Sequence, residues 1–228
     1  MDNKLEECII VSNLCKKVKA PEGELHILQD INLNVKRGEA IVITGESGSG
    51  KTTLLGLMAG LDSPDQGEVT LLGEPLSIKT EEQRASIRNG RVGFVFQSFH
   101  LVTGATALQN VMLPLELSGH GQAGQHAREV LVEVGLEHRM HTPVERLSGG
   151  EQQRVAIARA YAVQPEILFA DEPTGNLDTQ TGAQIIDILF NLRDQRGSSL
   201  VLVTHEQRLS ERGDREIKMA RGSIVDGP

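Results

Sequence analysis

Residues 40–55 read AIVITGESGSGKTTLL, a segment that carries the clearest evidence of the fold class. Ala40 to Thr44 is a continuous apolar run, which is typical of a strand buried on both faces. The pattern from Lys51 to Ala59 predicts a helix, with Gly60 as its stop. Between them, Gly45 to Thr52 matches the spacing G-x-x-x-x-G-K-T of a phosphate-binding loop, in the strand–loop–helix context that such a loop requires. We therefore expect an α/β protein that binds phosphate groups.

The glycines of this loop let consecutive backbone N–H groups turn inward around an anion, and the following helix adds the partial positive charge of its N-terminus. Lys51 can reach the β- and γ-phosphates of a nucleotide, and the Thr52 hydroxyl is placed to ligate Mg²⁺. The predicted nucleotide-binding residues of the loop are Gly45, Glu46, Ser47, Gly48, Ser49, Gly50, Lys51, Thr52 and Thr53.

Three further apolar runs share the character of Ala40 to Thr44, and helical patterns such as Gln184 to Leu192 separate them. Buried strands that alternate with helices indicate a parallel, doubly wound core sheet. The three runs are Phe94 to Phe96, Ile167 to Ala170 and Leu200 to Val203.

Outside this core, the N-terminal third is rich in short apolar or alternating segments, which predict antiparallel strands with one solvated face. They are Cys8 to Val11, Ile31 to Val35 and Glu68 to Leu72, and a small hairpin is expected at Glu216 to Met219 with Ser223 to Val225.

The strand signals disappear between Gln97 and Pro165, where helical patterns lie at Ala107 to Met112, Gln125 to Val134 and Gly150 to Val163. We interpret residues 98–164 as a helical subdomain inserted into a single domain that spans residues 1–228.

The composition excludes several classes of protein. Hydrophobic residues make up 39% and charged residues 24%, which is ordinary for a globular chain. The net charge of −8, with one Tyr, no Trp and five Phe, argues against broad nucleic-acid binding. No apolar run approaches the ~20 residues of a membrane span, and the start MDNKLEECII has no signal-peptide layout. We expect a soluble, cytosolic chain in which Cys8 and Cys15 are reduced.

A second chemical signal is Asp171-Glu172, at the end of the predicted strand Ile167 to Ala170. A carboxylate at the carboxyl end of a parallel strand faces the crevice where such sheets bind ligands. Asp171 can hold the hydration shell of Mg²⁺, and Glu172 is free to activate a water. With the phosphate loop upstream, this pair supplies a metal holder and a general base for phosphoryl transfer.

The third signal is LSGGEQQR, residues 147–154, where Ser148 is a plausible N-cap and Glu151 follows three residues later. Lying between a phosphate loop and an Asp-Glu strand, this segment resembles the signature of ABC-type ATPases. Gln97 matches the family's Q-loop glutamine, Gly175 to Asp178 its D-loop, and His205 its switch histidine. The resemblance covers essentially the whole chain and carries all of these motifs in family order.

This resemblance implies a P-loop ATPase fold and a Mg²⁺-dependent ATPase. It implies a head-to-tail homodimer that holds two ATP molecules between the loop of one subunit and the signature of the other. Glu172, His205 and Gln97 are then the catalytic residues, and Thr52, Gln97 and Asp171 the metal ligands. Outside the loop, the ATP-binding residues would be Ser148, Gly149, Gly150, Glu151 and Asp178.

The segments SGSGKTTLL, FVFQSFHLV and EPTGNLD are similar to those of ATPases of the lipoprotein-releasing and macrolide-export type, YbbA-like proteins above all. Such ATPases drive a separate membrane permease, in export or mechanical work at the cell envelope. The resemblance thus implies a cytoplasmic protein held at the inner face of the membrane by its permease. Only 23 residues follow His205, too few for a regulatory domain.

Two points remain open in the sequence. Where family members often stack adenine on an aromatic residue, this chain has Val18, which predicts weaker or less base-selective nucleotide binding. The other is the alternative that the chain is a soluble ABC-type ATPase acting on DNA, ribosomes or an assembly process. The acidic balance and the absence of basic or coiled-coil extensions count against that alternative, as intact Lys51 and Glu172 count against a purely regulatory module.

Overall fold

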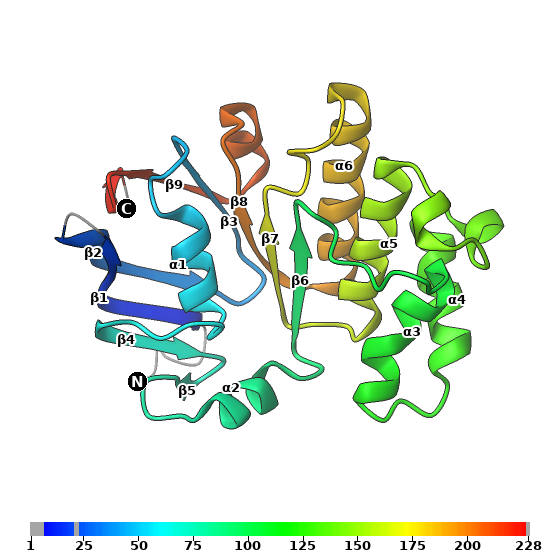
Figure 1. Cartoon of the computed structure of the whole chain (residues 1–228), viewed down its shortest axis with the longest axis horizontal. Coiled ribbons are helices and arrows are strands. Elements are labelled where there is room, and N and C mark those ends of the chain that lie inside the picture. Colours follow the sequence, from blue (N-terminus) through cyan, green and yellow to red (C-terminus); the bar gives the residue numbers. More distant parts are fainter. Residues whose placement is uncertain (1–6, 21–22, 227–228) are drawn as a thin grey trace. The chain divides into compact units, whose positions relative to one another are not determined.

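The computed structural model describes residues 7–20 and 23–226. It comprises two compact units: the first runs up to Arg88 and resumes at Ser199, and the second is Asn89–Ser198 (Figure 1). The outer limits of the predicted domain, residues 1 and 228, and the first six residues of the N-terminal segment lie outside the described residues.

The first unit contains the predicted antiparallel sheet, in the order β2-β1-β4-β5. Its strands are β1 (Glu7–Ala20), β2 (Gly23–Lys36), β4 (Gln66–Leu71) and β5 (Glu74–Pro75). The three predicted strand segments are confirmed, but β1 and β2 are each 14 residues long. Their pairing continues through Lys17 opposite His26 and Val18 opposite Leu25, because the hydrogen bonds of a hairpin do not require a buried face.

The same unit holds the strand that leads into the phosphate loop. β3 (Ala40–Gly45) pairs in parallel with β8 (Ser199–Val203) and with β9 (Arg215–Ala220). β10 (Ser223–Asp226) turns back antiparallel to β9, which confirms the predicted hairpin. Every residue of β8 and the first five of β3 are buried, as the continuous apolar runs predict. The helical elements of this unit are α1 (Lys51–Met58), α2 (Glu81–Arg88) and the 3-10 segment Gln207–Arg212.

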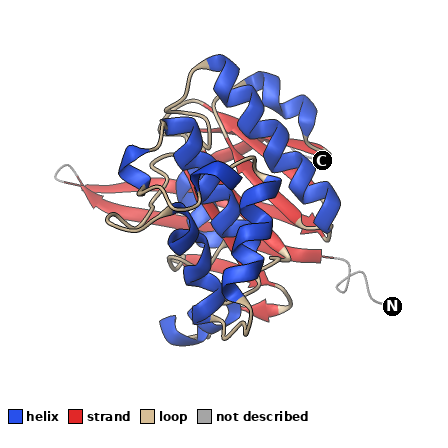
Figure 2. Cartoon of the chain, turned by 90° about the vertical axis from the view of Figure 1, so that its right-hand side faces the viewer, coloured by secondary structure: helices blue, strands red, loops and turns tan. Residues whose placement is uncertain are grey.

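The second unit is built around the parallel pair β6 (Val92–Phe96) and β7 (Ile167–Asp171). Its helices are α3 (Ala107–Leu117), α4 (Ala123–Glu133), α5 (Gly149–Ala162) and α6 (Thr179–Arg196), with 3-10 turns at Glu137–Arg139 and Val144–Arg146 (Figure 2, blue). α5 packs against α3, α4, α6 and β6, so nine of its residues are buried. This central position fixes the helix whose first turn carries the signature segment.

Helix α3 differs from its prediction. It continues one turn beyond Met112 to Leu117, with Pro114 inside it. A proline inside a helix removes its own N–H donor and crowds the carbonyl four residues earlier, yet Leu108, Val111 and Leu115 still bury the same face. Packing of that face therefore outweighs the local disruption.

Among the described residues, no helix combines the length and the apolar character needed to cross a membrane. The two cysteines, Cys8 and Cys15, are free thiols, as predicted.

Candidate nucleotide-binding site

The loop between β3 and α1 ends in an unusual helix start. The N-cap of α1 is Gly50, whose φ of 99° is left-handed. Among the described residues, no side chain caps this helix end, and the first turn of α1 contains no acidic residue. The first N–H groups of a helix have no partner within the helix itself. The N-terminus of α1 therefore keeps donors and a positive dipole end available for an anion.

Close backbone contacts require two glycines of this loop. A Cβ on Gly45 would lie 2.3 Å from the carbonyl oxygen of Met219, and a Cβ on Gly50 would lie 2.9 Å from that of Ile27. Both glycines also have positive φ angles, 152° and 99°, which other residues rarely adopt. The loop is thus shaped by strands β9 and β2 as well as by its own sequence.

Lys51 and Ser49 place polar atoms inside the loop. Lys51 is only 6% exposed, and its Nζ donates hydrogen bonds to the carbonyl oxygens of Gly45 (2.8 Å) and Glu46 (3.0 Å). The buried Oγ of Ser49 has no hydrogen-bond partner among the described residues. A buried ammonium and an unpartnered hydroxyl beside a helix N-terminus form a pocket that suits a phosphate oxygen.

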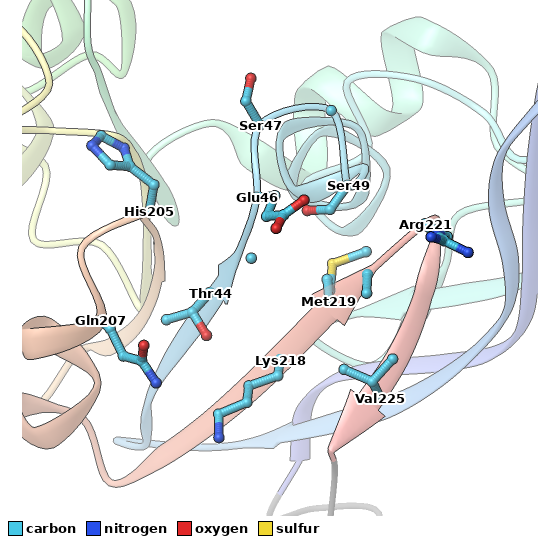
Figure 3. A pocket seen from close by; sticks show the side chains of 13 residues that line it. Thr44, Glu46, Ser47, Ser49, His205, Gln207, Lys218, Met219, Arg221 and Val225 are labelled. Carbon is cyan, nitrogen blue, oxygen red and sulfur yellow. The ribbon is translucent and has the colours of Figure 1, made fainter.

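A cavity of about 1010 Å³ opens over this loop (Figure 3). Residues 44–49 line it together with His205 and Gln207, which follow β8, and with residues 218–221 and 225 of the β9–β10 hairpin. Figure 3 shows His205 on one side of the loop and Met219 on the other. The structure therefore brings the predicted phosphate loop and the predicted histidine to one cavity within the first unit.

The remaining predicted catalytic residues lie at one edge of the second unit. Phe96 of β6 is the register partner of Asp171 of β7, so Gln97 and Glu172 leave the two strands side by side. Glu172 has a left-handed φ of 47°, a conformation uncommon for residues other than glycine. The chain therefore turns sharply at this residue, directly after the strand that carries Asp171.

Gln97 is held by the segment that follows β7. Its Nε2 donates to Oδ1 of Asn176 at 3.0 Å, and Nδ2 of Asn176 donates back to the carbonyl oxygen of Gln97 at 3.1 Å. Asn176 is a residue to which sequence reasoning assigned no role of its own. No local pattern in the sequence signals a contact between residues 79 positions apart.

The signature segment forms the N-terminus of α5, where the predicted capping box is confirmed. Ser148 Oγ accepts a hydrogen bond from the N–H of Glu151, and the Glu151 carboxylate accepts one from the N–H of Ser148 at 2.8 Å. That backbone bond lowers the pKa of Glu151 most; burial opposes it, and the Ser148 hydroxyl and Arg139 at 3.0 Å lower it further. The carboxylate is thus held in its ionised form.

Tight packing explains a glycine of this segment. A Cβ on Gly150 would lie 2.5 Å from Cγ2 of Thr181 in α6. The same first turn of α6 is capped by Asp178, whose carboxylate accepts from the N–H groups of Gln180 and Thr181. Hydrogen bonds from Thr181, side chain and then backbone, lower the pKa of Asp178. In this structure Asp178 therefore has a structural role as a helix cap.

The predicted site residues are divided between the two units. Residues 45–53 and His205 belong to the first unit, and Gln97, Asp171, Glu172, residues 148–151 and Asp178 to the second. Within the described ranges, no group of three or more His, Cys, Asp or Glu side chains is arranged to hold a metal. Val18, at the position expected to face the base, is 42% exposed and lies opposite Leu25, which is 53% exposed.

Comparison with known proteins places this geometry in a family. The family model described as ABC transporter matches residues 28–175. The chain is 50% identical to the uncharacterized ABC transporter ATP-binding protein YbbA of Escherichia coli, over 97% of this chain and 98% of that protein. It is 44% identical to the lipoprotein-releasing system ATP-binding protein LolD of Francisella tularensis, over 93% of each chain.

A solved structure is also similar to this chain. The dimeric post-hydrolysis state of the ATP-binding cassette MJ0796, bound to ADP and Pi, matches with a TM-score of 0.89 and 38% identity, over 96% of this chain and 97% of that one. The resemblance to ABC-type ATPases, and to YbbA-like proteins among them, is therefore confirmed. The chain belongs to the ABC transporter family, as an ATP-binding subunit that hydrolyses ATP.

Proposed function

We propose that this chain is the Mg²⁺-dependent motor subunit of a membrane transporter, and that two copies close around ATP to drive a separate permease. The observation that carries the proposal is the N-terminus of α1. It has an open helix end, the buried Lys51 ammonium and the unpartnered Ser49 hydroxyl at one loop. Residues 45–53 would hold the phosphates of ATP there.

The residues at hand also fit Mg²⁺, because hard cations prefer oxygen ligands. The Thr52 hydroxyl, the Asp171 carboxylate and the Gln97 amide oxygen would hold the ion. When bound, Mg²⁺ neutralises the negative charge that builds up on the phosphate oxygens during transfer.

In hydrolysis, a water attacks the γ-phosphorus, the bond between the γ-phosphorus and the β–γ bridging oxygen breaks, and ADP leaves. Glu172 accepts a proton from that water, and His205 donates a hydrogen bond to a γ-phosphate oxygen. Gln97 orients the attacking water and the metal. Two copies pairing head to tail would place residues 148–151 and Asp178 of one copy against the nucleotide of the other, and would exclude water from the reacting phosphate. The dimeric state named for MJ0796 supports this arrangement.

The permease would dock on the helical region, which we propose as an inserted subdomain of about residues 98–164. Residues 102–105 and one face of α3 line a cavity of about 520 Å³. Val102 and Leu113 on its walls are 46% and 38% exposed. An amphipathic helix of a permease would bury these apolar walls. This docking would hold the chain at the cytoplasmic face of the membrane, and the name of LolD supports work on lipoproteins or lipids of the envelope.

The test uses Glu172→Gln, which should bind ATP, hydrolyse it at least about 100-fold more slowly and remain in the closed dimer. The tagged variant is incubated with detergent-solubilised native membranes and Mg-ATP, recovered, and its partners are identified by mass spectrometry. Recovery of an integral membrane protein in stoichiometric amount supports the motor. Recovery of ribosomes, nucleic acid or soluble proteins alone contradicts it and favours the soluble alternative. Near-normal turnover of Glu172→Gln would instead remove Glu172 from the role of general base.

A further inference from the structure

Asn176 lies in the segment between β7 and α6 and makes two hydrogen bonds to a single residue. Its Oδ1 accepts from Nε2 of Gln97 at 3.0 Å, and its Nδ2 donates to the backbone carbonyl of Gln97 at 3.1 Å. The two bonds close a ring that contains both the main chain and the side chain of Gln97. One asparagine thus fixes the Gln97 amide relative to its own backbone.

The direction of these bonds settles which end of each amide faces the other. A carbonyl oxygen only accepts hydrogen bonds, so the Asn176 atom beside it is the NH₂ group. The oxygen of Asn176 then faces the Gln97 side chain, and only the NH₂ group of Gln97 can donate to it. Oε1 is therefore the end of the Gln97 amide that remains for a cation.

Gly175 restricts Gln97 from a second direction. A Cβ at this position would lie 2.7 Å from Nε2 and 2.9 Å from Cδ of Gln97. The amide of Gln97 therefore lies directly against the backbone of Gly175, where other residues have a side chain. The φ angle of Gly175 is not positive. Glycine is therefore required here by the lack of room for a side chain and not by the backbone conformation.

The register of β6 and β7 brings this pair to the site. Phe96 lies opposite Asp171, so Gln97 leaves β6 beside the strand end that carries Asp171. We propose that Asn176 is a positioning residue, which orients Gln97 so that Oε1 and not Nε2 is presented to the Mg²⁺ that accompanies ATP. The inference rests on the proposed function, in which Gln97 and Asp171 hold that ion. Neighbours that orient a ligand in this way tune metal affinity elsewhere in proteins.

The experiment measures metal binding, in the Glu172→Gln variant so that ATP is not consumed. Mn²⁺ replaces Mg²⁺ as the probe, and its binding in the presence of ATP is followed by electron paramagnetic resonance. Asn176→Ala should weaken Mn²⁺ binding about threefold to tenfold, the range that one or two net hydrogen bonds supply. ATP binding in EDTA and the thermal unfolding midpoint should not change. Asn191→Ala, an exposed asparagine on α6, is the matched control.

A second variant moves the Gln97 amide by another route. Gly175→Ala should displace the side chain of Gln97 and weaken Mn²⁺ binding to a similar extent. Gly121→Ala is its control, because a Cβ on Gly121 meets nothing within 4 Å.

A double-mutant cycle separates positioning from any other effect of Asn176. In a Gln97→Ala background, Asn176→Ala should weaken Mn²⁺ binding no further. Continued weakening in that background would overturn the inference, as would unchanged Mn²⁺ affinity in both Asn176→Ala and Gly175→Ala. If the parent variant has no ATP-dependent Mn²⁺ site, the metal assignment of the proposed function fails and this inference fails with it.

Discussion

Two helix N-termini of this molecule begin in opposite ways. α1 begins behind Gly50, with no side-chain cap and no acidic residue in its first turn, in the part of the chain that the structure describes. α5 begins behind Ser148, whose side chain and that of Glu151 complete a reciprocal capping box. The free N–H groups of a helix end attract anions. α1 thus leaves its end open to a ligand, whereas α5 is completed by its own carboxylate.

The two helix ends suit different roles in a binding site. The α5 end carries a negative charge in its first turn, and Arg139 pairs with that charge at 3.0 Å. Such an end is stable without a phosphate, and it would contribute to a site only when another subunit brings the nucleotide to it. We therefore expect substitutions at α1 to act on ATP affinity, and substitutions at α5 to act on dimerisation or stability.

The largest effect is expected for Lys51→Ala. The substitution removes the buried ammonium that lies beside two loop carbonyls and would donate to the β- and γ-phosphates, so ATP affinity should fall at least about 100-fold, the loss expected for two charge-assisted hydrogen bonds. Isothermal titration calorimetry measures it. Lys79→Ala, which removes only a surface ion pair with Glu74, should bind ATP normally, and equal affinities of the two variants would contradict the assignment of the α1 end.

Ser148→Arg should have the next largest effect, on assembly alone. A large cation at the α5 N-terminus would block the face proposed to meet the nucleotide of the second copy. In the Glu172→Gln background, the ATP-dependent dimer should be lost in size-exclusion chromatography, while one subunit still binds ATP. Ser118→Arg, at the exposed C-cap of α3, is the matched control. A closed dimer of Ser148→Arg would show that the α5 end is not at the interface.

Ser148→Ala should cost about 1 kcal/mol of unfolding free energy, the typical value of a lost N-cap. Urea denaturation measures the loss. Thr106→Ala removes the same kind of capping box from α3 and should cost a similar amount. If Ser148→Ala left the free energy of unfolding unchanged while Thr106→Ala lowered it, the α5 end would not depend on its own cap.

The smallest effect concerns pH. The bond from the Ser148 N–H holds the pKa of Glu151 below its ordinary value of 4.5. Its ionised form therefore stabilises the folded chain fully above about pH 5, and this contribution is lost as the pH falls through the lowered pKa. Glu151→Gln keeps the box but does not titrate, so its stability difference from the parent should shrink between pH 7 and pH 3, by less than about 1 kcal/mol. Urea midpoints at the two pH values measure it, and a difference that does not shrink would contradict the role of this carboxylate.

The contrast also shows how far sequence reasoning reaches. The capping box at Ser148 and Glu151 was predictable because its two partners lie three residues apart. The phosphate loop was predictable for the same reason, and the buried strand β3 because its apolar run is continuous. In each case the physical cause lies within a few neighbouring residues.

The features that escaped prediction depend on distant partners. Asn176 forms a hydrogen bond with Gln97, 79 positions away in the sequence. Helix α3 continues through Pro114 because its buried face packs on α5 and α4. The polar ends of β1 and β2 pair with each other although no apolar alternation marks them as strands. Tertiary contacts decide these features, and no local pattern in one sequence encodes them.

The close approach of Gly45 to the carbonyl of Met219 bears on the order in which the parts of this chain fold. Gly222 adds a second contact, since its N–H donates to the carbonyl of Ser49 at 3.1 Å. Met219 lies in β9 and Gly222 in the turn after it, both far along the chain from residues 45–49. The loop therefore reaches its final shape only after β9 has paired with β3, and nucleotide binding reports that this long-range pairing has formed.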